Sequence, residues 1–183
     1  MRADARKNYD RLLAVANVVV TEEGADASLR DIARRADVGL GTMYRHFPTR
    51  EALLEALLRT NFDELAAKAA VLESADQAGD ALVAWLRDFV ACADNYRGVI
   101  ASMVAAIEDP ESALHASCTA MKAAGARLLA RAQAAGAART DIDSTDLYAL
   151  GAALAWVGDQ PAFASRADHL FDIITGAILT TRP

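Results

Sequence analysis

Residues 38–54 read VGLGTMYRHFPTREALL and gather glycine, aromatic and basic residues in one short segment. Pro48 limits any helix before it, because the residue that precedes a proline is pushed out of the α region. The segment therefore predicts a short helix from Leu40 to about Phe47, with Gly39 and Gly41 at its start. Lacking a Cβ, these glycines would let the backbone come close to another molecule.

A second short helix is expected immediately before this segment. Ser28 and Asp31 have the spacing of a capping box, in which the serine oxygen takes a free backbone N–H and the acid favours the positive helix end. This helix would run to about Ala36 and be followed by a break at residues 37–39. Two short helices joined by a tight turn, the second with basic and aromatic residues, are typical of a helix-turn-helix.

Longer helices are expected elsewhere, so the sequence predicts an all-α fold. From Arg6 to Glu23 the apolar residues follow the spacing of one helical face, and Gly24 lies just past the helix end. Thr49 can cap a helix from Arg50 to about Glu73. Breaks and caps further on predict helices at about 81–96, 99–109, 111–135, 144–160 and 163–181.

Charge is distributed unevenly along the 183 residues, whose net charge is −6. Residues 1–60 carry ten Lys/Arg and nine Asp/Glu, a charge of +1, which leaves −7 for the remainder. Such asymmetry is expected when only one end of a protein meets a polyanion. The chain has no run of about 18 apolar residues and no apolar signal core at its start. We therefore expect a cytoplasmic protein.

Four side chains would reach outward from the helix that begins at Leu40: Thr42, Tyr44, Arg45 and His46. Tyrosine and histidine donate to phosphate oxygens, whereas arginine can pair a phosphate or a guanine edge. Alternatively, Tyr44 and His46 pack between helices, since one helical face usually serves the core.

The N-terminal stretch offers a further contact through Arg2, Arg6 and Lys7. These residues could form a flexible arm that enters the minor groove. They could equally belong to an ordinary solvated terminus.

Residues 8–57 strongly resemble the DNA-binding head of the TetR family of bacterial transcriptional regulators. The resemblance rests on residues at fixed spacing, namely Leu12, Leu13, Gly24, Ser28, Leu29, Asp31, Ile32, Ala33, Ala36, Val38, Gly41, Tyr44, His46, Phe47, Arg50, Leu53 and Leu54. It implies a three-helix DNA-binding head and a six-helix body that dimerises and usually holds an effector pocket. We expect residues 1–48 to form the helix-turn-helix DNA-binding domain and residues 49–183 the ligand-binding and dimerisation domain.

The resemblance also implies roles for single residues. The predicted DNA-binding set is Ser28, Leu40, Gly41, Thr42, Tyr44, Arg45, His46 and Arg50. In the family's pattern Ser28 touches a phosphate, residues 40–42 meet bases, and Tyr44 and His46 contact the DNA backbone. Arg50 stands where the family usually has a lysine near that backbone.

The head departs from the family's pattern at four positions. Asp37 replaces the usual turn glycine and Gly39 the usual serine cap, while Val20 and Met43 replace a common phenylalanine and leucine. Glycine is a tolerable N-cap, so loss of the serine costs only a few tenths of a kcal/mol. An aspartate in the turn adds unfavourable charge near phosphates unless it faces away. These changes bear on base preference.

The body carries large apolar side chains at helical spacing. Such stripes usually pack as core, but aromatic residues and methionines also suit an adaptable apolar site, and the family usually has its pocket in this region. His115 could supply a polar handle. We therefore expect a mostly apolar small-molecule effector of unknown identity. The predicted effector-binding set is Phe62, Trp85, Phe89, Cys92, Tyr96, Met103, Ile107, His115, Cys118 and Met121.

The last two predicted helices offer a contact between subunits. Two helices from each subunit would form a four-helix bundle, the family's usual dimer contact, although the same residues could be buried within the monomer. We favour a homodimer, because two half-sites bring the weak affinity of a single head into the specific range. The predicted interface set is Leu147, Leu150, Leu154, Ile173, Ile174 and Ile178.

No catalytic or metal-binding constellation is evident in the sequence. Glu108, Glu111 and His115 have helical spacing, but Pro110 interrupts them and no second Glu/His set exists. We expect no metal, no cofactor and no enzyme activity. The predicted function is a DNA-binding transcriptional repressor that an effector releases from a palindromic operator. The alternatives are a helical-bundle enzyme or metal-binding protein whose head only resembles a DNA binder, and a regulator of the same fold controlled by a protein partner or by nothing.

Overall fold

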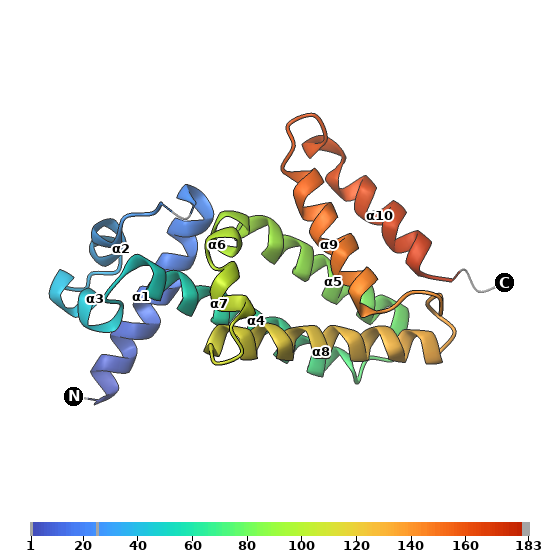
Figure 1. Cartoon of the computed structure of the whole chain (residues 1–183), viewed down its shortest axis with the longest axis horizontal. Helices are drawn as coiled ribbons and strands as arrows, with labels where there is room; N and C mark the ends of the chain where they lie inside the picture. The colour runs from blue at the N-terminus through green and yellow to red at the C-terminus, as the bar shows by residue number, and fades with distance from the viewer. Residues whose placement is uncertain (1, 25, 181–183) are drawn as a thin grey trace. The chain divides into compact units, whose positions relative to one another are not determined.

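The computed structural model describes residues 2–24 and 26–180, and their regular structure is helical (Figure 1). This confirms the all-α prediction. The α-helices are α1 (Arg2–Glu23), α2 (Leu29–Arg35), α3 (Leu40–His46), α4 (Arg50–Leu72), α5 (Ala78–Asn95), α6 (Arg97–Ser102), α7 (Val104–Glu108), α8 (Ala113–Ala134), α9 (Ser144–Gly158) and α10 (Ala167–Ile178), with a 3-10 helix η1 (Ala164–Arg166) before α10. No described helix is long and apolar enough to cross a membrane.

The helix ends follow local signals in the sequence. Gly24 and Gly136 follow α1 and α8 with φ values of +80° and +68°, in the left-handed region that glycine adopts without a Cβ penalty. At the start of α9, the Asp143 carboxylate accepts hydrogen bonds from the Thr145 and Asp146 amides at 2.7 and 3.1 Å. The Asp146 carboxylate accepts one from the Asp143 amide at 3.0 Å, which completes the capping box.

Several predicted helix bounds were wrong, including the starts of α5 at Ala78 rather than Ala81 and of α8 at Ala113 rather than Glu111. Helix α1 begins at Arg2 rather than Arg6, and the predicted last helix is divided into η1 and α10. The predicted helix at 99–109 is two short helices, α6 and α7, which meet at Met103. The Met103 amide donates to the carbonyls of both Val99 and Ile100, at 3.0 and 3.1 Å. A shared bond of this kind is common where a helix ends.

The chain divides into two compact units. The first comprises Met1–Thr60 and Tyr96–His115, and the second comprises Asn61–Asn95 and Ala116–Pro183. Helices α4 and α8 therefore contribute residues to both units. The first unit contains α6 and α7 in addition to the helix-turn-helix, so its bounds differ from the domain predicted at residues 1–48. The functional division at residue 48 remains a prediction.

The core of the first unit holds α3 against α1 and α2. Met43 is fully buried and Phe47 is 2% exposed. The Phe47 ring stacks on Tyr9 of α1 with ring centroids 5.1 Å apart. Burial of such large side chains stabilises the position of α3 by about 1.5–3 kcal/mol each.

The core of the second unit centres on aromatic rings of α5 and α9, which pack against each other, with α10 beside α9 (Figure 1). Trp85 is fully buried, and its Nε1 donates to the Leu65 carbonyl oxygen at 2.9 Å. Its ring stacks on Phe89 at 5.6 Å, and Tyr148 lies edge-on to both rings. A Cβ at Gly125 would clash with the Trp85 ring and would lie 2.5 Å from the Tyr148 hydroxyl oxygen, so this glycine makes room for the cluster.

Candidate nucleic-acid interface

The turn between α2 and α3 is closed by backbone hydrogen bonds. The Asp37 amide donates to the Arg34 carbonyl at 3.2 Å, and the Val38 amide donates to the Ala33 carbonyl at 3.0 Å. This is the Schellman pattern, and Asp37 occupies its left-handed position with φ +51°. Aspartate is among the few residues other than glycine that visit this region, at some steric cost.

Helix α2 begins with the predicted serine cap. The Ser28 Oγ accepts a long hydrogen bond, 3.5 Å, from the Asp31 amide. The Asp31 carboxylate instead accepts from Arg34 and Arg35, each at 2.5 Å. The hydrogen bond from Arg34, followed by that from Arg35, lowers the pKa of Asp31.

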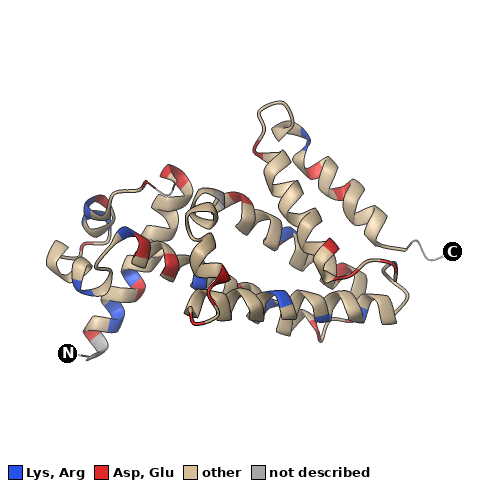
Figure 2. Cartoon of the chain, viewed as in Figure 1, with Lys and Arg blue, Asp and Glu red and all other residues tan. Residues whose placement is uncertain are grey.

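Several arginines of the helix-turn-helix are held by carboxylates. Arg35 also pairs with Glu22 at 3.3 Å and Glu23 at 2.6 Å, which ties α2 to the end of α1. Arg50, in the predicted DNA-binding set, lies 3.2 Å from Asp26. Figure 2 shows this mixture of charges along α1 and α2. Exposed pairs of this kind contribute about 0–1 kcal/mol each, so a phosphate can compete for the arginine.

Helix α3 presents one face outward and one to the core. Gly41, Tyr44 and Arg45 are exposed, whereas Met43 is buried. The Arg45 Nη2 donates to the Thr42 Oγ1 at 2.8 Å. No heavy atom lies within 4 Å of the Cβ position at Gly41, so the outer surface here is open.

Tyr44 and His46 differ in their environments: Tyr44 points outward, whereas His46 is partly packed between helices. Tyr44 is 48% exposed and is free to contact another molecule. His46 is half-buried, and its ring lies edge-on to Tyr9 with centroids 5.8 Å apart. Tyr9 was not in the predicted site. Its place on the apolar face of α1 could be read from the sequence, but its contact with His46 could not.

The predicted N-terminal arm is helical. Residues 2–7 belong to the first turns of α1, and Arg6 and Lys7 are exposed. The expectation of a flexible arm was therefore wrong for this stretch, whereas Arg6 and Lys7 are solvated, as the alternative expected. Two basic side chains remain available on the surface of α1. The side chain of Arg2 lies outside the described residues.

The predicted effector-binding residues are divided between the two units. Tyr96, Met103, Ile107 and His115 belong to the first unit. The members in the second unit are Phe62, Trp85, Phe89, Cys92, Cys118 and Met121. His115 uses its Nδ1–H for the Ile107 carbonyl oxygen at 2.8 Å. Tyr148, which sequence reasoning missed, joins the aromatic cluster from α9.

Both cysteines have environments that favour the protonated thiol. Burial, followed by the nearby Glu64 carboxylate, raises the pKa of Cys92 to about 12. Burial also raises the pKa of Cys118. Within the described part of the chain, no group of three or more His, Cys, Asp or Glu side chains gathers as a metal site would require.

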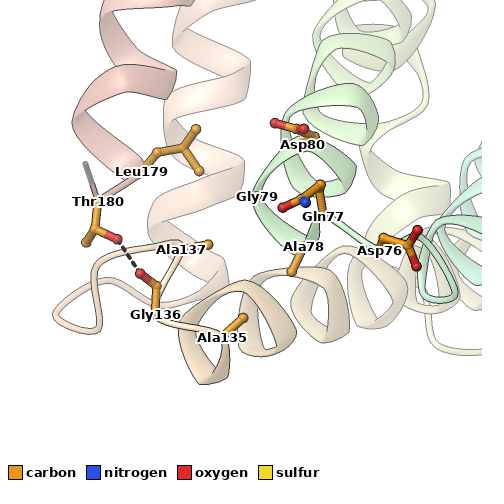
Figure 3. Close-up of a pocket in the computed structure, with 10 residues that line it drawn as sticks. All are labelled: Asp76, Gln77, Ala78, Gly79, Asp80, Ala135, Gly136, Ala137, Leu179 and Thr180. Atoms are coloured by element: carbon orange, nitrogen blue, oxygen red, sulfur yellow. Dashed lines mark hydrogen bonds between the residues drawn. The ribbon is translucent and has the colours of Figure 1, made fainter. Parts of the chain in front are cut away.

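A pocket of about 430 Å³ lies in the second unit, between the start of α5, the turn after α8 and the end of α10 (Figure 3). Its lining includes the acidic residues Asp76 and Asp80 together with Gln77, Leu179 and Thr180. Thr180 Oγ1 donates to the Gly136 carbonyl at its edge, at 2.6 Å. None of the predicted effector-binding residues lines this pocket.

The predicted interface residues differ in their exposure. Leu147, Leu154 and Ile178 are 0%, 7% and 4% exposed, so they pack largely within the protomer, the alternative given for these residues above. Leu150 and Ile174 are half-buried. Ile173 is 53% exposed, and two large side chains that the predicted interface set omitted are also exposed in this region, Trp156 at 59% and Phe163 at 47%.

Comparisons with family models cover both parts of the chain. Residues 12–57 match the model described as bacterial regulatory proteins, tetR family. Residues 77–177 match the model described as transcriptional regulator SbtR-like, C-terminal domain. Among curated proteins, an HTH-type transcriptional regulator from Staphylococcus aureus is 34% identical over 64 residues. That match spans 34% of this chain and only 35% of the curated relative.

Solved structures match over nearly the whole chain. A TetR transcriptional regulator from Streptomyces coelicolor is 36% identical with a TM-score of 0.77, over 95% of this chain and 99% of that one. A TetR transcription regulatory protein from Mycobacterium vanbaalenii is 34% identical with a TM-score of 0.74, over 98% of this chain and 99% of that one. The chain therefore belongs to the TetR family of transcriptional regulators, and its helix-turn-helix is the DNA-binding part.

Proposed function

We propose that the chain is a homodimeric repressor that binds a palindromic operator and is released by a mostly apolar small molecule. The observation that carries this proposal is the two-sided character of α3. Met43 anchors its inner face in the core, while Gly41, Tyr44 and Arg45 form an open outer face. A short helix of this kind, with small, aromatic and basic residues outward, fits the major groove.

The predicted DNA contacts follow from this placement. Tyr44 and the partly covered His46 would donate to phosphates on the groove walls, and Ser28 at the start of α2 would contact the adjoining backbone. Arg50 would exchange its carboxylate partner Asp26 for a phosphate, at small cost because both side chains are exposed. A hydrogen bond from a neutral side chain to the charged phosphate is worth about 1.5–3 kcal/mol.

We propose that the dimer forms through α9 and α10. Trp156, Phe163 and Ile173 are large apolar side chains exposed on these helices and the segment between them. Gly176 has no heavy atom within 4 Å of its Cβ position, so it leaves the outer face of α10 open to a close helix contact. Tryptophan is among the residues enriched at the energetically dominant centre of protein interfaces.

We propose that the effector contacts the second-unit members of the predicted set. Phe89 and Cys92 are half-buried beside the buried Trp85, so a ligand could reach their side chains. Because Trp85, Phe89 and Tyr148 already stack together, the ligand would bind against the ring cluster or displace one ring. Helix α4 runs without interruption from Arg50 to Leu72 and would carry the change to the DNA-binding part. The effector cannot change the DNA affinity by a larger factor than the ratio of its own affinities for the DNA-binding and the released conformations.

The test is direct binding to duplex DNA with and without ligand. The full chain is first used to select bound duplexes from a random pool, and we expect a palindromic sequence. Apolar compounds are then screened for release of that duplex, with Trp85 fluorescence reporting binding. Phe89→Ala should reduce the response to ligand and leave DNA binding intact. A chain that selects no DNA, or that binds compounds without any change in DNA affinity, contradicts the proposal.

A further inference from the structure

We propose that Arg45 reads a guanine in each operator half-site, and that Thr42 is the residue that positions its guanidinium. This inference rests on the proposed binding of α3 in the major groove. It goes further in choosing base contact over phosphate contact for Arg45, and in assigning a function to the Thr42 hydroxyl.

The position of Arg45 around the helix supports a base contact. Each residue of an α-helix advances by about 100°, so Gly41 and Arg45 both lie about 160° from Met43, on opposite sides of it. Met43 is fully buried and marks the core side of α3. Gly41 and Arg45 therefore occupy the middle of the outer face, whereas Thr42 and Tyr44 flank it at about 100° from Met43. In a groove, the middle of the face meets the base edges and the flanks meet the walls of sugar and phosphate.

The local packing leaves Arg45 room to extend. Helical side chains lean toward the N-terminus, so the Arg45 side chain passes over the turn that contains Gly41 and Thr42. The Cβ position at Gly41 has no neighbour within 4 Å, so nothing blocks this path. The hydrogen bond from Arg45 Nη2 to Thr42 Oγ1, at 2.8 Å, shows that the side chain takes this direction.

The hydrogen bond to Thr42 leaves the recognition groups of Arg45 available. A guanidinium has five N–H donors and Thr42 accepts one of them. The others can still form a two-pronged contact with O6 and N7 of guanine, the commonest specific contact in the major groove. Because the neighbouring hydroxyl already restricts the side chain, less conformational entropy is lost on binding.

The charge of Arg45 also distinguishes it from its neighbours. Arg35 and Arg50 are paired with carboxylates, at 2.5 Å from Asp31 and 3.2 Å from Asp26. Among the described residues, the partner of Arg45 is a neutral hydroxyl. Within the part of the chain that the structure describes, no carboxylate pairs with its positive charge, so Arg45 can bind an acceptor on DNA without first leaving an acid.

The experiment combines base and side-chain changes. Wild-type chain selects its duplex from a random pool, and each conserved guanine is then replaced in turn by 7-deazaguanine, which lacks the N7 acceptor. We expect at least one such replacement per half-site to weaken wild-type binding about tenfold. Arg45→Ala should bind the same duplex more weakly and be indifferent to that replacement. Thr42→Val should lose part of the guanine preference, and Thr42→Ser, which keeps the hydroxyl, should retain it.

Different failures have different meanings. If Arg45→Ala weakens all duplexes equally and still responds to 7-deazaguanine as the wild type does, Arg45 contacts phosphate and the inference is wrong, while DNA binding stands. A selected duplex without a conserved guanine overturns the inference in the same way. Selection of no duplex by the wild type contradicts the proposed function itself. Circular dichroism and thermal melting of each variant identify any loss of folding. If Arg45→Ala does not fold, Arg45→Lys replaces it in the same binding assay, because lysine keeps the positive charge but lacks the paired N–H donors of the guanidinium.

Discussion

Replacing Gly41 by alanine should have opposite effects on stability and on DNA binding. Gly41 lies in the first turn of α3, and among the described residues an added Cβ would meet no heavy atom within 4 Å beyond the helix's own nearby backbone. Alanine is favoured over glycine in a helix by about 0.5–1 kcal/mol. The folded state should therefore gain up to about that amount, which raises the melting temperature by about 1–4 °C for a chain of this length.

The same methyl group should weaken DNA binding. It would project from the middle of the outer face, about 160° from the buried Met43, and would hold the helix away from the base edges. Loss of one good base contact costs about 1–3 kcal/mol, which corresponds to a dissociation constant about five- to 150-fold higher. Fluorescence anisotropy with the selected duplex measures this change, and differential scanning calorimetry measures the stability.

Gly24→Ala is the matched contrast. Gly24 also has no heavy atom within 4 Å of its Cβ position, but its φ is +80°, a region that costs an alanine about 1–2 kcal/mol. This variant should lose stability, while the folded protein binds DNA as before. Our reasoning about Gly41 is refuted if Gly41→Ala binds the selected duplex as tightly as the wild type, or if it melts below the wild type.

Three further outcomes are expected. Ile173→Glu should yield monomers in sedimentation velocity because it places a charge in the proposed apolar interface, whereas Val71→Glu, on α4 at a side chain that is 72% exposed, should stay dimeric; two dimeric variants would move the interface elsewhere. Gly125→Ala should lower the melting temperature by a few degrees, since overpacking costs about 1–3 kcal/mol and the new Cβ would lie 2.5 Å from the Tyr148 hydroxyl oxygen; an unchanged melting temperature would show that the rings can shift freely. At pH 8, iodoacetamide should label Cys92 on the order of a thousandfold more slowly in the native chain than in urea, because a pKa of about 12 leaves little thiolate at pH 8; comparable rates in mass spectrometry would refute the raised pKa.

The helix-turn-helix could be predicted from sequence because its signals are local. The serine before α2, the proline after α3 and the threonine before α4 each act within a few residues of their own position. In the structure Ser28 and Thr49 accept the expected backbone hydrogen bonds, at 3.5 and 3.1 Å. The start of α1 was missed for a related reason. Residues 2–7 contain no periodic apolar side chain and are helical through the propensity of alanine, arginine and lysine.

Contacts between distant segments could not be predicted in the same way. The apolar spacing of Leu147 and Ile178 indicated correctly that these side chains are buried, but it could not show whether the chain itself or a partner buries them. The hydrophobic effect is proportional to the apolar area buried and has no direction, so burial within the chain and burial against a partner give the same apolar spacing in the sequence. No glycine or proline lies at Met103, so the sequence contains no local signal for the break between α6 and α7.

The charge pattern of the head constrains how this protein can achieve specificity. Residues 1–60 have a net charge of only +1, and carboxylates hold Arg34, Arg35 and Arg50. Each arginine that moves to a phosphate leaves an acid behind, so the net gain in nonspecific attraction per contact is small, and few counterions are released. Weak nonspecific binding raises the share of the affinity that base contacts and the second half-site must supply. In our proposal, Arg45 in the middle of the outer face of α3, present twice in a dimer, would meet that requirement with few residues.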